Sequence, residues 1–258
     1  MAPNKRILIP IPSYGCDPTE VSIPWQLISE KGIDVVFATP DGETAVADSL
    51  MLKGERLGIW KPLLQARRDA VLAYQQMQLY PAFASPLSYQ DINSADFDGI
   101  LLPGGHDKGI KEYLESKVLQ ALVVEFFNAK KPVGAICHGV VLAARSIDPK
   151  TQRSVIYDYN TTALLKSQEL TAYNLTRWWL KDYYLTYPDV TVEDEVKSVL
   201  AKKSQFLSGA TPLFRDDMAH LGRGFVVQDR NYLSARWPGD AYNFSLQYIE
   251  MLERPLTH

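Results

Sequence analysis

The feature that most constrains the fold is a buried strand, a helix and a second buried strand, which follow one another in the first forty residues. Residues 6–12 (RILIPIP) and 33–39 (IDVVFAT) are short apolar runs typical of buried strands. Between them, residues 19–31 place Val21, Trp25 and Ile28 on one helical face, and Gly32 is positioned to end the helix. Because strands joined through a helix run parallel, this order predicts a parallel sheet covered by helices.

The same alternation continues to the end of the chain. It predicts further strands, helices and a closing hairpin and helix at residues 97–102, 111–129, 132–136, 140–146, 225–228, 232–235 and 239–252. We therefore predict an α/β three-layer sandwich with a mainly parallel central sheet and helices on both faces. With no repeat and no linker-like break, we expect one domain over residues 1–258, with insertions at about 43–92 and 168–221. The first insertion has helical patches but no clear strand, and we expect it to cover one edge of the sheet.

Composition narrows the class of protein. Lys and Arg number 27 against 30 Asp and Glu, and this net charge of -3 argues against a nucleic-acid partner. No apolar stretch approaches the roughly 20 residues that cross a bilayer, and the run 7–11 is too short for a signal peptide. Two cysteines cannot form a disulfide framework in a chain of 258 residues. We expect a cytoplasmic protein that binds neither nucleic acid nor membrane.

Cys137 has the most informative surroundings of any residue. It lies where the apolar run 132–136 turns directly into a helical run, with His138 and Gly139 next to it. Such a turn exposes a nucleophile above the sheet, and the positive end of the helix with a neighbouring imidazolium would stabilise its thiolate. The alternative is a small buried apolar side chain, the common role of a free cysteine. We favour the nucleophile, whereas Cys16 lies in a turn before Asp17-Pro18 with no such setting.

Other candidate site residues follow strands that end at the same edge of the sheet, where ligands of open parallel sheets bind. His138 could act as general base and proton shuttle, or could be a half-buried histidine bonded to a carbonyl. Gly104 and Gly105, followed by His106, would let backbone amides approach a substrate oxygen, although Pro-Gly-Gly is also an ordinary turn. Glu20, in the first turn of a helix, could favour the helix dipole or, with a raised pKa, donate a hydrogen bond to a thiol.

The sequence contains no motif that is typical of a bound metal or nucleotide cofactor. The four histidines, His106, His138, His220 and His258, show no paired-ligand spacing, so we expect no metal. Neither a Walker A loop nor a G-x-G-x-x-G after the first strand is present, and we expect no nucleotide cofactor. An aromatic group is either core packing or the wall or lid of a pocket, and it comprises Trp178, Trp179, Tyr183, Tyr184 and Tyr187.

Taken together, Glu20 opening a helix, residues 100–106 (ILLPGGH) and residues 135–139 (AICHG) resemble the ThiJ/PfpI superfamily. The likeness extends to residues 34–42 and 234–244 and leaves out mainly the two insertions. It implies a flavodoxin-like, class I glutamine amidotransferase-like fold, closest in organisation to the heat-shock glyoxalase and chaperone branch. Fold alone does not choose among the reactions of this superfamily.

The resemblance also implies roles for individual residues. It makes Cys137 the nucleophile, His138 its adjacent imidazole and Glu20 the carboxyl near the sulfur, with the Gly105 and His138 amides as oxyanion donors. Members with a triad place an acidic residue in the loop after the strand that follows the elbow helix. The corresponding residues 170–174 (LTAYN) offer no carboxylate, so Asn174, Glu169 or Asp158 would have to orient the imidazole.

The leading functional hypothesis is a glyoxalase-like reaction, in which Cys137 attacks a small 2-oxoaldehyde and water releases a 2-hydroxy acid without a cofactor. One alternative is an amidase, peptidase or other cysteine hydrolase or hydratase working through a thioacyl intermediate. An alternative of another class is a stress-response chaperone or redox sensor in which Cys137 becomes a sulfinic acid beside Glu20. The expected partner is a small-molecule substrate, with a homodimer possible for the family.

Overall fold

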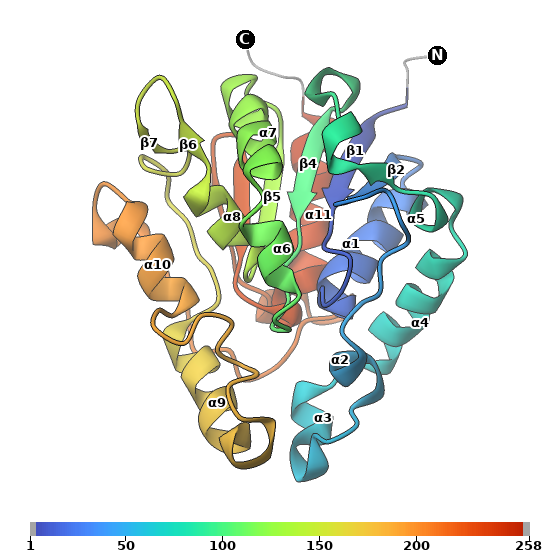
Figure 1. The fold of residues 1–258 in the computed structure, drawn as a ribbon, viewed down its shortest axis with the longest axis vertical. Helices are drawn as coiled ribbons and strands as arrows, with labels where there is room; N and C mark the ends of the chain where they lie inside the picture. The colour runs from blue at the N-terminus through green and yellow to red at the C-terminus, as the bar shows by residue number, and fades with distance from the viewer. Residues whose placement is uncertain (1–3, 255–258) are drawn as a thin grey trace.

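Residues 4–254 are described by the computed structural model, and they are built around a seven-stranded sheet (Figure 1). The strands are β1 (Arg6–Pro10), β2 (Asp34–Thr39), β3 (Leu87–Ser88), β4 (Gly99–Leu102), β5 (Val133–Ile136), β8 (Val226–Asp229) and β9 (Tyr232–Ala235). Their order across the sheet is β3-β2-β1-β4-β5-β9-β8. Every neighbouring pair is parallel except β8 and β9, which form an antiparallel hairpin. The predicted, mainly parallel sheet is confirmed.

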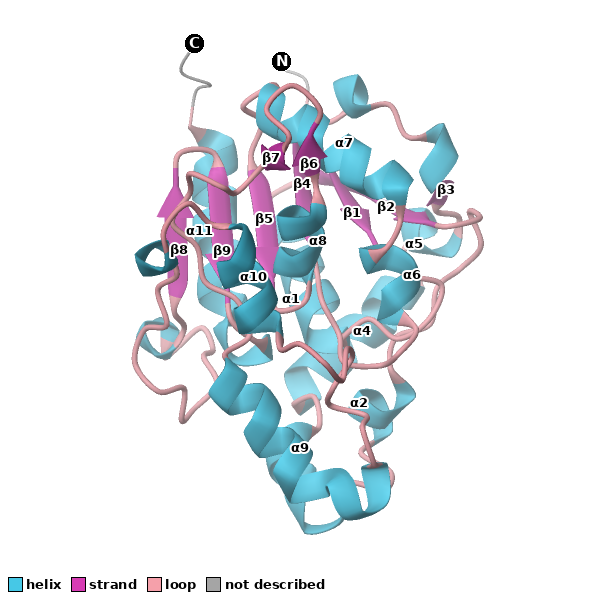
Figure 2. Cartoon of the chain, turned by 60° about the vertical axis from the view of Figure 1, so that its left-hand side comes forward, coloured by secondary structure: helices cyan, strands magenta, loops and turns pink. Residues whose placement is uncertain are grey.

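Helices cover both faces of the sheet, as Figures 1 and 2 show. One layer contains α1 (Pro18–Glu30), α4 (Arg68–Gln78) and α11 (Ala241–Glu253), and the other contains α6 (Ile110–Leu114), α7 (Lys117–Asn128) and α8 (Gly139–Arg145). The sheet residues Ile7, Leu8 and Ile9 have no exposed surface because both layers cover them. The predicted three-layer α/β sandwich is therefore confirmed.

Helix α1 shows how the sequence sets an element that positions the site. The Asp17 side chain accepts hydrogen bonds from the backbone N–H groups of Thr19 and Glu20, and Pro18 occupies the first turn, where its missing N–H is not needed. Val21 and Ile28 are completely buried, as their helical spacing predicts. The capping aspartate consequently fixes Glu20 at the carboxyl ends of the strands.

The prediction of a single helix over residues 111–129 is wrong in one respect, because the segment forms two helices. The chain breaks between α6 and α7, where the Ser116 hydroxyl accepts a hydrogen bond from the Leu119 N–H and caps the start of α7. A serine cap satisfies free N–H groups at the start of a new helix, so α7 can begin here without a glycine or proline. The apolar pattern of the sequence therefore does not reveal the break.

The segment at residues 43–92 lies at one edge of the sheet. It forms α2 (Ser49–Lys53), α3 (Lys61–Leu64), α4 and α5 (Pro81–Ala84), and it also supplies the edge strand β3, which we did not predict. That strand pairs only Leu87 and Ser88 with β2, and two residues are too few to show a strand period.

The chain after α8 also differs from expectation. A small separate hairpin, β6 (Ile147–Asp148) with β7 (Arg153–Ser154), is followed by α9 (Lys166–Leu180) and α10 (Val192–Val199). Residues 170–174 lie inside α9, so their assignment to a loop after a strand is wrong. In Figure 1, α9 and α3 lie on opposite sides below the carboxyl ends of the strands. Among residues 4–254, none of the helices has the length and apolar character needed to cross a bilayer.

Candidate active site

Cys137 occupies the sharp turn between β5 and α8. Its φ of 56° is in the left-handed region, which is unfavourable for a residue with a side chain and is found preferentially at functional sites. The Cys137 N–H donates to the Ala235 carbonyl of β9 at 3.1 Å, which anchors the turn on the sheet. The Sγ atom lies 3.5 Å from Nδ1 of His138. The structure therefore has the predicted strand-to-helix turn, with the thiol and the imidazole in contact.

Two glycines allow the loop after β4 to pack against this turn. A Cβ atom at Gly139 would lie 2.0 Å from the Leu102 carbonyl oxygen, and one at Gly104 would lie 2.6 Å from the His138 nitrogen. Both contacts are with backbone atoms, which cannot rotate away. The closeness of residues 102–104 to the Cys137 turn thus requires the glycines that the sequence provides.

Glu20 is fully buried and lies against Cys137 and Gly104. Its Oε2 accepts a hydrogen bond from the Gly104 N–H at 2.9 Å, its Oε1 has no partner among residues 4–254, and the Cys137 thiol is near enough to influence the pKa of the carboxyl. Burial raises the pKa of Glu20 well above its ordinary value, which favours the protonated carboxyl, the form that can donate a hydrogen bond. In this structure the Gly104 N–H therefore donates to Glu20, and the N–H groups of Gly105 and His138 stay the predicted oxyanion donors.

The charge state of the resting site differs from the sequence-based expectation. Burial raises the pKa of the Cys137 thiol well above its ordinary value and lowers that of His138 well below it. The neutral imidazole removes the predicted imidazolium, and the solvent-free position disfavours a thiolate. The site therefore rests as a thiol beside a neutral imidazole, which is poised to accept the thiol proton.

None of the three residues considered as a partner for His138 reaches it. Nε2 of His138 has no hydrogen-bond partner within residues 4–254. Asn174 is exposed on α9, and Asp158 lies on another surface with Arg230 bonded to its carbonyl oxygen. Glu169 is buried, and its Oε2 accepts the Val192 N–H at 3.0 Å at the start of α10.

The buried position of Glu169 leads to a prediction about stability. Burial raises its pKa to about 7, so the folded chain holds a proton that the unfolded chain releases near pH 4.5. Stability should fall as the pH rises through this window, by about 3 kcal/mol from this group alone. Glu169→Gln should lack this part of the loss in urea unfolding at pH 5 and pH 8. Glu125→Gln, an exposed change on α7, should retain the full loss, and an unchanged loss in Glu169→Gln would contradict the assignment.

A cavity of about 320 Å³ lies between α9, α3 and the loops at residues 211–215 and 237–238. His106 lines it, and the His106 ring packs edge-on against the His138 ring and the Tyr184 ring, each with centroids 5.0 Å apart. Cys137 and His138 have no exposed surface and do not line the cavity. His106 is accordingly the contact between the cavity and the thiol.

Several residues lining this cavity were not predicted from the sequence. Among them are Asp17, Arg215 and Trp237, together with Tyr184, which was predicted only as part of the aromatic group. Asp17 could have been found as a helix cap close to Glu20. Arg215 and Trp237 lie in irregular segments more than 190 residues from Glu20, and no local pattern connects them.

The fold also brings together three possible metal ligands. One ligand atom each from His106, Cys137 and His138 lies within 4.8 Å of the other two, and all three residues are buried. The sequence offered no paired-ligand spacing because His106 and the Cys137-His138 pair belong to different loops. A thiolate and two imidazoles are donors that suit soft or intermediate transition metals. His220 instead contacts Asp217 on the surface, and His258 lies outside the described residues.

Comparisons with known proteins find a matching family model and relatives of this fold. A family model described as ThiJ/PfpI family-like matches residues 11–221. A deglycase of Thermococcus kodakarensis is 24% identical over 166 residues, which cover 64% of this chain and 69% of the relative. DJ-1 homolog D of Arabidopsis thaliana is 29% identical over 151 residues, 56% of this chain but only 33% of that protein. The crystal structure of glyoxalase III from Candida albicans superposes with a TM-score of 0.72 at 18% identity, covering 96% of this chain and 98% of that one.

Proposed function

Because the chain belongs to the ThiJ/PfpI family, we propose that it is a cysteine-dependent, cofactor-independent enzyme that acts on a small carbonyl compound in a glyoxalase-like or deglycase-like reaction. Cys137 is the nucleophile in this proposal. The names of the Thermococcus and Candida proteins support the reaction class. The observation that carries the proposal is the strained Cys137 with Sγ 3.5 Å from the neutral His138 and in contact with the protonated Glu20.

The first step joins the thiol to the aldehyde. As His138 takes the thiol proton, Sγ forms a bond to the aldehyde carbon, and the π electrons move to the carbonyl oxygen. That oxygen is stabilised by the N–H groups of Gly105 and His138 and then takes the proton back from the His138 imidazolium, which gives a hemithioacetal and a neutral imidazole. Glu20 holds the sulfur in place by donating a hydrogen bond to it.

The second step moves a proton between adjacent carbons. His138 removes the proton from the carbon bonded to sulfur and returns it to the neighbouring carbon, while the hydroxyl proton moves from the first oxygen to the second. These two transfers convert the 2-oxo hemithioacetal into the thioester of a 2-hydroxy acid. Water then breaks the carbon–sulfur bond, releases the 2-hydroxy acid and restores the thiol. The net change is addition of one water molecule to a 2-oxoaldehyde, with no oxidant or reductant.

Hydrolysis by a complete triad is less well supported. A triad needs a group that holds the imidazole in one orientation, and Nε2 of His138 has no partner in residues 4–254. The proton shuttle between two carbons requires only the imidazole itself. The site therefore favours the glyoxalase-like reaction over amide hydrolysis.

The contact between Glu20 and Cys137 also supports a second candidate, a redox sensor. A sulfinic acid on Cys137 would receive the hydrogen bond that Glu20 donates. Peroxide titration followed by intact mass distinguishes the two functions. Oxidation confined to Cys137 with no turnover of any carbonyl would favour the sensor.

The glyoxalase-like proposal is tested with methylglyoxal as the only substrate. The purified chain, without added thiol or metal, should convert methylglyoxal into lactate in equal amounts, well above the uncatalysed rate. The proposal fails if no lactate forms while an ester substrate gives a burst of product and an acyl adduct on Cys137 by mass spectrometry. That result would identify a cysteine hydrolase.

A further inference from the structure

Two poorly exposed arginines of this fold have different surroundings. The guanidinium of Arg236 makes two hydrogen bonds of 2.9 Å to the Asp240 carboxylate. Arg215 has no carboxylate oxygen within 4.0 Å among residues 4–254, and its Nη1 has no partner at all. Its Nη2 only donates to the carbonyl oxygens of Leu63 and Leu64, at 3.1 and 3.4 Å. The charge of Asp17 stabilises the Arg215 guanidinium from beyond 4.0 Å, and the Trp237 ring lies 5.6 Å from it, but no carboxylate bonds to its Nη1. A poorly exposed guanidinium with an unpaired nitrogen is unfavourable, and a ligand that accepts from this nitrogen would stabilise it.

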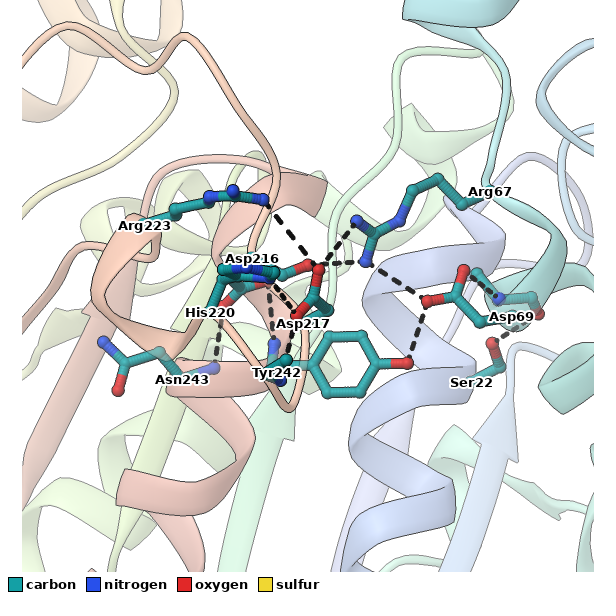
Figure 3. A network of polar contacts seen from close by, with 11 residues as sticks. Ser22, Arg67, Asp69, Asp216, Asp217, His220, Arg223, Tyr242 and Asn243 are labelled. Carbon is teal, nitrogen blue, oxygen red and sulfur yellow. Dashed lines mark hydrogen bonds and ion pairs between the residues drawn. The ribbon is translucent and has the colours of Figure 1, made fainter.

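The backbone beside Arg215 is firmly held. Figure 3 shows the neighbouring Asp216 and Asp217 joined to Arg67 at the start of α4 and to α11. The Asp216 carboxylate accepts hydrogen bonds from the N–H groups of Asn243 and Tyr242, at 2.8 and 3.3 Å. Its own N–H donates to the Gly239 carbonyl at 2.8 Å. Arg215 is thus positioned in advance of any ligand, which lowers the entropic cost of binding.

The cavity that Arg215 lines combines an apolar wall with unused hydrogen-bond donors. Its apolar side chains include Leu63, Leu64, Leu164, Leu175 and Leu213. Three further side chains that line it contain a buried polar atom without a partner, namely Tyr184 Oη, Trp237 Nε1 and His106 Nδ1. Asp17 is the one acidic residue in the lining, and its Oδ1 already accepts two backbone N–H groups. A ligand oxygen could accept from these unpaired donors after a small side-chain rotation.

The size of the cavity also indicates a ligand with an apolar part. About 320 Å³ is within the range of sites for ligands much larger than methylglyoxal. Burying an apolar part of a ligand against the leucine side chains would be favourable through the hydrophobic effect. His106, which lines the cavity, contacts His138 beside Cys137.

We infer that the substrate carries a carboxylate, joined through an apolar body to its reactive carbonyl, and that Arg215 binds this carboxylate. The reactive carbonyl rests on the proposed function, but the carboxylate and the apolar body rest on the cavity. A planar guanidinium suits a carboxylate because two N–H groups can bind its two oxygens. Arg215 is in this view a specificity-determining residue and takes no part in the bond changes.

Binding of unreactive compounds tests the inference without requiring turnover. Calorimetry on the full chain compares para-methylbenzoate with para-methylbenzamide, which has the same shape and no charge, and with acetate, which has no apolar body. We expect para-methylbenzoate to bind at least about tenfold more tightly than either. Arg215→Gln should reduce the preference for the acid over the amide to within about twofold, and Arg215→Lys should keep part of it. Arg223→Gln, an exposed change near Asp217, should leave the preference unchanged.

Equal binding of the acid and the amide to the unaltered chain would overturn the inference, as would a full preference retained in Arg215→Gln. The melting curve of Arg215→Gln shows whether this variant folds. If it does not, the inference is tested by comparing acid and amide binding in the unaltered chain and in Arg215→Lys. Lactate formation without a carboxylate preference would reject only this inference. A carboxylate preference without lactate formation would reject only the proposed function.

Discussion

Cys137→Ala should lower lactate formation from methylglyoxal by at least about a thousandfold, because no other group in the site can form the bond to the aldehyde carbon. The effect should lie in kcat, since the alanine variant keeps the cavity and its lining. Alanine has the same Cβ as cysteine, so the backbone requirement at a φ of 56° is unchanged. The variant should therefore remain folded, and its loss of activity would report on the sulfur itself.

Cys16→Ala is the matched control for this experiment. Cys16 is also fully buried, and burial raises the pKa of its thiol, but it has no imidazole next to it and does not line the cavity. The rate of lactate formation by Cys16→Ala should stay within about threefold of that of the unaltered chain, because Cys16 takes no part in the bond changes. Comparable rates in Cys137→Ala and the unaltered chain would reject Cys137 as nucleophile. An equal loss in both variants would mean that either substitution acts through packing.

The central sheet could be predicted because its signals are local. Strands β1, β2 and β4 are short apolar runs that end at or directly before a proline, and the strand, helix, strand order of residues 6–39 favours a parallel arrangement. The break at Ser116 and the two-residue strand β3 were missed because neither changes the apolar pattern. The misplaced residues 170–174 have another cause: the assignment relied on a resemblance to proteins that continue differently after the elbow helix, whereas this chain forms α9.

Part of the candidate site could also be predicted from local sequence, and part could not. The turn at Cys137 and the glycines of residues 104–105 could be predicted, since a close approach of backbone to backbone demands small residues in sequence. The charge state could not, because it depends on burial by segments distant in the chain: the sequence suggested a thiolate and an imidazolium, but the buried site holds both groups neutral. Arg215 could not be predicted for the same reason, since only the folded chain shows that one of its nitrogens is buried without a partner.

Gly139→Ala should be the most damaging single substitution for folding. The added methyl would lie 2.0 Å from the Leu102 carbonyl oxygen, 2.7 Å from the Leu102 carbonyl carbon and 2.8 Å from the Pro103 oxygen. All three are backbone atoms at the end of β4, so α8 and β4 would have to separate in the middle of the sheet. We expect a loss of about 4 kcal/mol or more, seen as a melting temperature lowered by about 10 °C or as insoluble protein.

Gly222→Ala is the control, because no heavy atom lies within 4 Å of a Cβ at that position and its φ is not in the left-handed region. It should change the free energy of unfolding by no more than about 0.5 kcal/mol. If Gly139→Ala melts as the unaltered chain does, the packing of residues 102–104 against the turn is not as tight as described. Activity adds a second readout, since Gly104 in the same loop donates to Glu20. A Gly139→Ala variant that folds but loses lactate formation would show that the separation displaces Glu20 from the thiol, and that the glycine serves the position of the carboxyl as well as the fold.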